Sequence, residues 1–248
     1  MSNIYHINEV PLSVTMAERD HGVIISDKLL WNKQVCKVKQ DAEVVKCNTR
    51  SIKSASVRHV IYLTLVRSHL GYATQVCVPQ SKELIRKTQR IQCRATKYIL
   101  NLPFLCEESY EDRLIKLDLL PVSYWHDYLD MVFFFKSVTG LVKVNPTVIP
   151  SRRVLSRATR SSSNANVTLF VPKKCKTTTY QRSLFIHTAR IWKALADHIG
   201  LSITISFSKF KAHLLYSAIE SNHYVNYMTL KILAHCSLSL QVATMPVI

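Results

Sequence analysis

Few residues of this 248-residue chain have the types and spacing that catalysis at a metal centre requires. Nucleotidyl transfer uses two metal ions held by carboxylates, and polymerases usually supply a pair of adjacent aspartates as part of that site. The sequence contains no Asp-Asp pair, and its closest acidic pairs are Glu107-Glu108 and Glu111-Asp112. These acids stand at the expected start of a helix, where capping and the helix dipole account for them. We therefore predict no catalytic residue and no enzymatic activity for the chain on its own.

The histidines and cysteines form no recognisable site either. Zinc sites use short spacings such as CxxC or HxxxH, and the sequence has neither. No nucleophile elbow and no glycine-rich phosphate loop is present. We predict no metal site and no cofactor. The seven cysteines are odd in number and no signal peptide is visible, which predicts reduced thiols in an intracellular protein, with nucleus and cytoplasm both open.

The strongest candidate for function is a binding surface in "KELIRKTQRIQCRATKYIL", residues 82–100. On a helical wheel its apolar residues fall on one side and its cations on the other. The predicted nucleic-acid-binding residues are Lys82, Arg86, Lys87, Arg90, Arg94 and Lys97. Such a row holds phosphates without reading bases. The alternative is that the cations only keep the outer face of the helix in water.

The net charge of +17 is concentrated in residues 51–100 and 151–200. The second region adds predicted nucleic-acid contacts at Arg152, Arg153, Arg157, Arg160, Lys173 and Lys174. Segregated positive charge suits a polyanion, so we predict RNA, DNA or an RNA–DNA hybrid as the partner, and no small-molecule substrate. We predict no membrane partner, because the longest apolar run, residues 131–142, is too short for a bilayer and contains Lys136.

The spacing of apolar residues predicts a mainly α fold, since most of it has a period near 3.6 and only four glycines are present. We expect helices at 31–50, 54–77, 81–102, 107–118, 121–141, 181–199 and 206–220, and the tail "YMTLKILAHCSLSL" to add another. Ser81 is a plausible N-cap for the third. Residues 3–26 read as a small hairpin or edge strands. Residues 143–180 read as a mobile basic connector with one short strand at "VTLFV".

Two consecutive segments resemble a known family. "LVRSHLGYATQVCVP" (65–79) followed by "RIQCRATKYI" (90–99) resembles the segment just after the catalytic domain in reverse transcriptases of non-LTR (LINE-type, jockey-like) retrotransposons. The family runs approximately as LVRSxLEYAxxVWxP and then RVQRRATKxI. The matching positions are Leu65, Val66, Arg67, Ser68, Leu70, Tyr72, Ala73, Val76, Pro79, Arg90, Gln92, Arg94, Ala95, Thr96, Lys97 and Ile99. Shorter family elements follow the same order on both sides, among them "SYEDRLIKLDLL" at 109–120.

The resemblance implies a thumb-like helical bundle at 31–142, preceded by a remnant of palm-edge strands at 1–30. A basic flexible connector at 143–180 and a C-terminal helical extension at 181–248 would follow. In the complete enzyme the thumb grips the phosphates of template and primer, a role that the resemblance gives to Arg86, Arg90, Arg94 and Lys97. The family's catalytic aspartates, which bind Mg, would precede Met1. The chain is therefore expected to be a truncated, non-catalytic fragment of an RNA-directed DNA polymerase.

The sequence departs from the family pattern at several positions. Gly71 stands in place of Glu, Cys77 in place of Trp, Cys93 in place of Arg, and Trp125-His126 in place of an Arg pair, while Lys193 and Ala196 interrupt a WNxLP element. The loss of three cations weakens the expected grip. Two other roles fit the same sequence: a helical interaction or structural protein with incidental charge, and a thumb supplied in trans to a separate palm.

Overall fold

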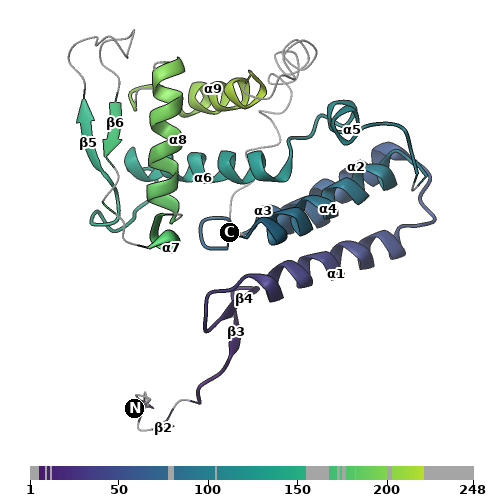
Figure 1. Ribbon diagram of the computed structural model, residues 1–248, viewed down its shortest axis with the longest axis horizontal. Coiled ribbons are helices and arrows are strands. Elements are labelled where there is room, and N and C mark those ends of the chain that lie inside the picture. Colours follow the sequence, from purple (N-terminus) through teal and green to yellow (C-terminus); the bar gives the residue numbers. More distant parts are fainter. Residues whose placement is uncertain are drawn as a thin grey trace.

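The structure is a computed structural model that describes residues 6–8, 10–11, 13–77, 81–103, 105–154, 168–171, 174, 177–181, 183–199 and 203–220. This part of the chain is mainly helical, as the sequence predicts, with short antiparallel strand pairs before and between the helices (Figure 1). The tail in which a further helix is expected lies outside the described residues.

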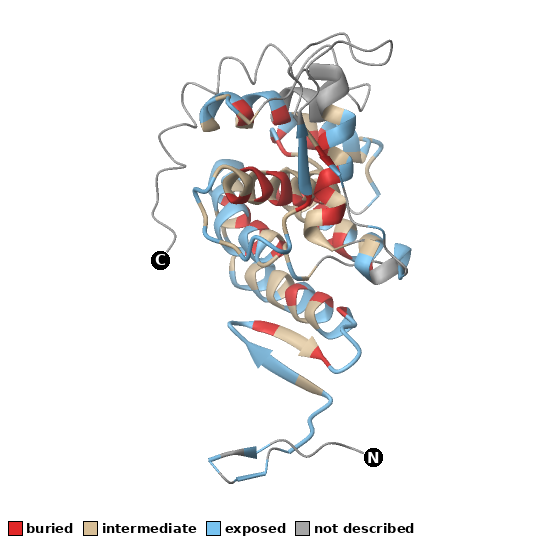
Figure 2. Cartoon of the chain, turned by 90° about the vertical axis from the view of Figure 1, so that its left-hand side faces the viewer, coloured by how far each residue is buried: buried red, intermediate tan, exposed pale blue. Residues whose placement is uncertain are grey.

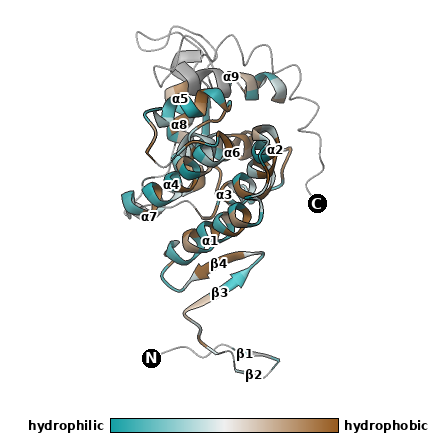
Figure 3. Ribbon diagram, turned by 90° about the vertical axis from the view of Figure 1, so that its right-hand side faces the viewer, coloured by the Kyte–Doolittle hydropathy of each residue, from teal (hydrophilic) through white to brown (hydrophobic). Residues whose placement is uncertain are grey.

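Two small hairpins begin the chain. β1 (His6–Ile7) pairs with β2 (Val10–Pro11), and β3 (Ala17–Asp20) pairs with β4 (Val23–Ser26). Gly22 has a φ of 86° in the turn between β3 and β4, a conformation that glycine adopts without strain. The strand β3 is mostly exposed, while β4 is apolar and faces the helices (Figures 2 and 3). The expected N-terminal hairpin is thus present, and β4 attaches it to the helices.

A small core joins β4 to the helices beside it. Val23 of β4 packs with Trp31, Val35 and Leu84, which are all buried. Trp31 immediately precedes α1 (Asn32–Asn48), and Leu84 lies in the first turn of α4 (Lys82–Ile99). Ser81 caps α4 as predicted, since its Oγ accepts a hydrogen bond of 3.1 Å from the Leu84 backbone N–H.

The expected helix at 54–77 is wrong in its length and its regularity. It consists of α2 (Ala55–Ile61), a π-helix η1 (Tyr62–Arg67) and α3 (Ser68–Gly71). The helix ends at Gly71 because Tyr72 is extended, with a ψ of 133°, and Ala73 has a φ of 55°. In η1 the side chains of Tyr62, Val66 and Arg67 all point into the protein, so the π-helix widens the buried face of this segment.

Helix α6 is the central element of the molecule. It follows α5 (Tyr110–Lys116) and spans Val122–Val138. Its first residue, Val122, belongs to an aliphatic core shared with α1, η1, α3, α4 and α5. Its second half contributes Met131, Phe134 and Phe135 to another core, and every residue of the helix is buried or half-buried (Figure 2). The expected bundle at 31–142 and the C-terminal extension therefore share one helix.

The second core is aromatic and includes part of the predicted connector. Strands β5 (Ser151–Val154) and β6 (Thr168–Val171) pair antiparallel, and Phe170 of β6 is buried against the second half of α6. The helices α7 (Thr178–Gln181), α8 (Leu184–Ile199) and α9 (Phe207–Glu220) follow, and α8 contributes Trp192. The expectation of a single short strand in 143–180 was incomplete, because β6 has a pairing partner in β5.

Candidate nucleic-acid interface

Helix α4 has the two faces that its sequence predicts. Leu84, Thr88, Ile91 and Ile99 are buried against the bundle. The exposed cations on the outer side are Lys82, Arg86, Lys87, Arg90 and Arg94. Lys97 is partly buried and differs from the other five in this respect. The exposed row therefore covers the first three turns of the helix and does not continue into its last turn, where Lys97 is partly buried.

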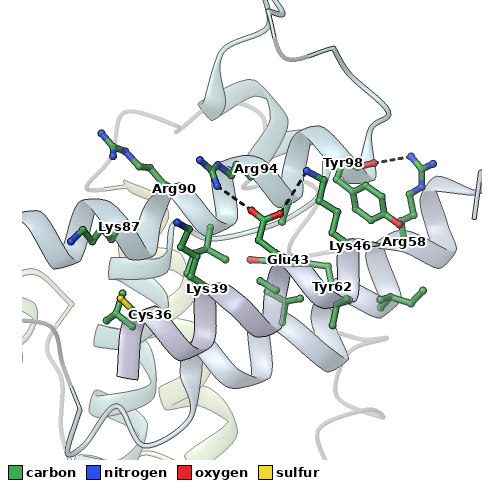
Figure 4. A pocket seen from close by; sticks show the side chains of 17 residues that line it. Cys36, Lys39, Glu43, Lys46, Arg58, Tyr62, Lys87, Arg90, Arg94 and Tyr98 are labelled. Carbon is green, nitrogen blue, oxygen red and sulfur yellow. Dashed lines mark hydrogen bonds and ion pairs between the residues drawn. The ribbon is translucent and has the colours of Figure 1, made fainter. Parts of the chain in front are cut away.

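The row borders a groove that the sequence did not reveal, here called the α1/α4 groove. It has a cavity of about 280 Å³ between α1, α2–η1 and α4 (Figure 4). Apolar side chains such as Val35, Ile61 and Ile91 form its lining together with two alanines, Ala42 and Ala95. The cations that line it are Lys39, Lys46, Arg58, Lys87, Arg90 and Arg94, and the one acid among its lining residues is Glu43.

Two of these cations, Lys39 and Lys46, come from α1 and were missed by the sequence analysis. They are seven residues apart, a spacing that places side chains on one face of a helix. That spacing was a usable signal, but the first fifty residues carry almost as many acids as cations and did not look basic. The tertiary structure adds α1 to the basic surface by packing it beside α4.

Part of the positive charge is neutralised within the chain. Glu43 accepts a hydrogen bond of 3.0 Å from Arg94 and lies 3.9 Å from Lys46, while Lys87 and Glu83 form an exposed pair at 2.7 Å. The hydrogen bond from Lys87 is the main cause that lowers the pKa of Glu83. Exposed pairs of this kind are weak, so Arg94, Lys46 and Lys87 stay accessible to a stronger anionic partner.

Other cations of the surface have no acidic partner. Within the described ranges no ion pair is formed by Lys39, Lys82, Arg86 or Arg90. Lys39 and Arg90 stand on opposite sides of the α1/α4 groove (Figure 4). An anion that enters the groove therefore meets unpaired positive charge from both helices.

Arg58 lines the groove but is committed to the fold. It is buried, and its guanidinium donates to the backbone oxygens of Ile52 and Tyr98 and to the Asn101 side chain. It also lies 4.6 Å from the centre of the Tyr98 ring. The bond to Tyr98 satisfies a carbonyl in the last turn of α4, where a cation is stabilised by the helix dipole.

Several residues that carry the family resemblance are buried, and they hold the bundle together. Gln92 donates to the Leu120 carbonyl at 3.0 Å and accepts from the Tyr110 hydroxyl at 2.7 Å. Arg67 donates to the same Leu120 carbonyl at 3.3 Å, and burial lowers the pKa of its guanidinium. Gln92 has donor and acceptor partners inside the protein, whereas Nη1 of Arg67 is buried without a hydrogen-bond partner among the described residues. Both side chains are buried in the bundle, which leaves ligand binding to the exposed cations.

Arg113 is the centre of a second buried polar cluster. Its Nε donates to the Thr96 hydroxyl at 3.1 Å, and its terminal nitrogens donate to the Glu108 carbonyl at 2.6 Å and to the Cys93 sulfur at 3.3 Å. The side chain therefore ties α4 to the segment that leads into α5. Cys93, one of the departures from the family pattern, acts here as an acceptor for a buried arginine.

Two other departures from the family pattern contact each other. A Cβ atom at Gly71 would lie 2.8 Å from Nε1 of Trp125 and 3.0 Å from Cδ1 of Leu129. Glycine is therefore needed where α3 meets α6. In the same contact, His126 Nε2 lies 2.8 Å from the Leu70 carbonyl, and Arg67 lies 4.6 Å from the Trp125 ring centre. The family pattern has charged residues at Gly71, Trp125 and His126, whereas in this chain these three residues pack α3 against α6.

The second predicted basic cluster is only partly within the described residues. Arg152 and Arg153 lie on β5 and are exposed, and Lys174 is exposed as well. Arg157, Arg160 and Lys173 lie outside the described residues. Figure 1 shows β5 far from α4 along the long axis of the molecule. The structure therefore does not bring Arg152 and Arg153 next to the α4 row.

The acidic residues near α5 behave as capping and surface groups. Ser109 caps α5, and its hydroxyl donates to the Asp112 carboxylate at 2.6 Å. Glu108 pairs with Lys116 at 2.7 Å. Among the residues that the structure describes, no group of three or more His, Cys, Asp or Glu side chains is arranged to hold a metal ion. The helices of this part of the chain are all too short or too polar to span a membrane.

Comparison with protein-family models, curated proteins and solved structures finds no match. The function must therefore be argued from the residues and their geometry.

Proposed function

We propose that the chain binds the sugar-phosphate backbone of RNA, DNA or an RNA–DNA hybrid, without sequence specificity, through α4 and the α1 side of the α1/α4 groove. We further propose that it is a post-palm, thumb-like part of a non-LTR retrotransposon reverse transcriptase, on the motifs described above. The exposed row on α4 carries this proposal. Lys82, Arg86 and Arg90 follow one another along the helix and have no acidic partner in the described structure.

The geometry supports backbone contacts rather than base reading by this row. Arg86, Arg90 and Arg94 repeat every four residues, so their Cα atoms advance about 6 Å per step along one side of the helix. Long flexible cations spaced in this way can follow a charged strand, and they offer no fixed set of donors to a base edge. Affinity should therefore depend on salt more than on sequence.

The test is fluorescence anisotropy of the full chain with single-stranded RNA, duplex DNA and an RNA–DNA hybrid across a salt series. Contact with four phosphates gives a slope of log Kobs against log salt of about −3 to −4. The double variant Arg90→Glu with Arg94→Glu should abolish binding while circular dichroism stays unchanged. The matched control is Lys193→Glu with Lys209→Glu, two exposed cations on α8 and α9 that give the same change in net charge.

Equal binding by the two double variants would refute the role of α4. Absence of binding by the folded wild-type chain at low salt would refute the function as a whole.

A second candidate function, docking onto another protein, is favoured by a row of exposed apolar side chains. Val57 and Val60 on α2, and Leu63 and Leu65 on η1, are all more than a third exposed, with Val60 at 58%. Exposed apolar rows of this kind mark interaction surfaces. A palm domain in trans fits this candidate. Val60→Lys should then abolish the association while leaving nucleic-acid binding intact, which pull-down and anisotropy measure separately.

A further inference from the structure

We infer that the α1/α4 groove receives a base of single-stranded nucleic acid while the neighbouring phosphates contact the cations at its edges. This inference rests on the proposed backbone binding and adds a preference for unpaired strands, which backbone contacts alone do not provide.

The interior of the groove is apolar although its edges are charged. Ile91, Val66 and Tyr62 are buried core residues whose surfaces form part of the lining. A surface that only holds phosphates gains nothing from such a lining, because phosphates remain hydrated. A flat, mostly apolar base loses little by leaving water, and every base has an apolar face. The combination of apolar interior and cationic edges thus matches one nucleotide of a strand.

The size of the cavity limits its occupant to a group smaller than a drug-sized ligand. Its volume of about 280 Å³ lies just below the range of roughly 300–1,000 Å³ found for pockets that hold drug-sized ligands. Two small residues leave this space open, Ala42 on α1 and Ala95 on α4. Both are half-buried and pack on the aliphatic core, so a longer side chain at either position would enter the cavity.

The charges are placed on both sides of the cavity. Lys39 lies on the α1 side, and Arg90 lies on the α4 side (Figure 4). A strand that crosses the groove can place the phosphates before and after the inserted base near these two side chains. In a duplex the base is paired and stacked, and its extrusion costs a few kcal/mol. The groove should therefore favour single strands.

The first experiment compares three probes on the wild-type chain at one salt concentration. They are an oligothymidylate of about twelve nucleotides, an abasic strand of the same length, and a duplex. Loss of one inserted base should weaken binding of the abasic strand by about tenfold or more. If the abasic strand binds as tightly as oligothymidylate, the inference is overturned while the proposed backbone binding stands. If none of the three binds, both fail.

The second experiment locates the base without changing the protein. Cys36 and Cys47 are both exposed thiols on α1, but only Cys36 lines the groove. Oligothymidylate should slow alkylation of Cys36 by iodoacetamide and leave Cys47 unaffected, as measured by mass spectrometry. The abasic strand should protect Cys36 less. Equal protection by the two strands, or none by either, would place the base elsewhere and overturn the inference.

The third experiment fills the groove. Ala95→Leu should remove the difference between oligothymidylate and the abasic strand and leave the salt slope of duplex binding unchanged. Ala42→Leu fills the same space from the other helix and should give the same result. Ala212→Leu, at an exposed position of α9, is the matched control. Retention of the full difference in a folded Ala95→Leu variant contradicts the inference.

Discussion

In the core that α1, η1, α4 and α5 enclose, arginine and amide side chains are buried among aliphatic ones, whereas the core of α6, β6, α8 and α9 is built from aromatic rings. The first contains Arg67, Gln92 and Arg113, each with directional hydrogen bonds. In the second, the ring of Trp192 contacts the rings of Phe134, Phe170 and Phe210, and its centroid lies 5.3–5.8 Å from theirs. One helix, α6, connects them.

The two cores should respond differently to substitution. A buried hydrogen-bond network tolerates few substitutions, because each lost partner leaves another polar group unsatisfied. Arg67, Gln92 and Thr96, three of the residues that carry the family resemblance, lie in this network. An aromatic core is stabilised by buried apolar surface area and by dispersion attraction, and it accepts other apolar residues of similar volume. The polar core also supports the groove, since Gln92 and Thr96 are on α4.

Breaking the aromatic core should have the largest effect on stability. Trp192→Ala removes a fully buried ring and should lower the free energy of unfolding by about 3–5 kcal/mol. Urea denaturation followed by circular dichroism measures the change. Tyr180→Ala, at an exposed aromatic residue of α7, is the control and should cost less than about 0.5 kcal/mol. Similar losses in the two variants would mean that Trp192 is not a centre of this core.

A buried carboxyl group on α6, that of Asp130, should make stability depend on pH. Burial is the main cause that raises the pKa of Asp130 on α6 from 3.8 to about 6. The folded state therefore binds this proton more tightly than the unfolded state, so the contribution is complete below pH 3.8 and is lost as pH rises through 6. The shift of about two units corresponds to up to about 3 kcal/mol. Asp130→Asn should raise stability at pH 8 relative to wild type.

A second titratable group, His187 on α8, adds to the pH dependence above pH 6.5. A hydrogen bond from His187 to Asp127, at 3.1 Å, is the main cause that raises the pKa of the imidazole. Its contribution has the same sign, because stability is present below the unfolded pKa and is lost as pH rises. The variant His187→Gln should keep the loss of stability between pH 3.8 and 6, which belongs to Asp130, and lack the loss above pH 6.5. Denaturation of wild type and variant across both intervals separates the two contributions. A flat profile in wild type would contradict both assignments.

Breaking the polar core should cost less than removing Trp192 but more than any surface change. Arg113→Met keeps most of the side-chain volume and leaves the Thr96 hydroxyl and the Glu108 carbonyl without their donor. We expect a loss of about 2 kcal/mol. Lys116→Met is the matched control, because Lys116 also contacts Glu108 but is 62% exposed. Thermal denaturation compares the two, and equal losses would argue against a structural role for Arg113.

The smallest expected effect is on nucleic-acid affinity and concerns Glu43, the one acid among the residues that line the α1/α4 groove. Glu43→Gln removes the acid that pairs with Arg94 and lies near Lys46, so nucleic-acid affinity should rise a few-fold at low salt, with stability changed by less than about 1 kcal/mol. Asp41→Asn is the matched control, because Asp41 pairs with Lys37, which does not line the groove. Anisotropy titrations measure both, and equal gains would indicate a general charge effect.

Much of the fold could be predicted from the sequence because helical periodicity is local. The two faces of α4, the Ser81 cap and the approximate bounds of α1 and α6 all follow from residue spacing. The helix expected at 54–77 stops at Gly71, whose contact with Trp125 joins residues far apart in sequence and is not visible in residue spacing. The partner strand β5 was missed because an isolated "SRRV" carries little strand signal.

By itself the sequence determined which residues are cationic, which faces of the helices are apolar, and where the helices begin. It did not determine which cations reach solvent. Arg58, Arg67 and Arg113 are buried, while Lys39 and Lys46 join Arg90 and Arg94 around one groove. Only tertiary structure decided this, because a periodic pattern defines one buried face per helix, whereas the neighbours of that face depend on long-range packing.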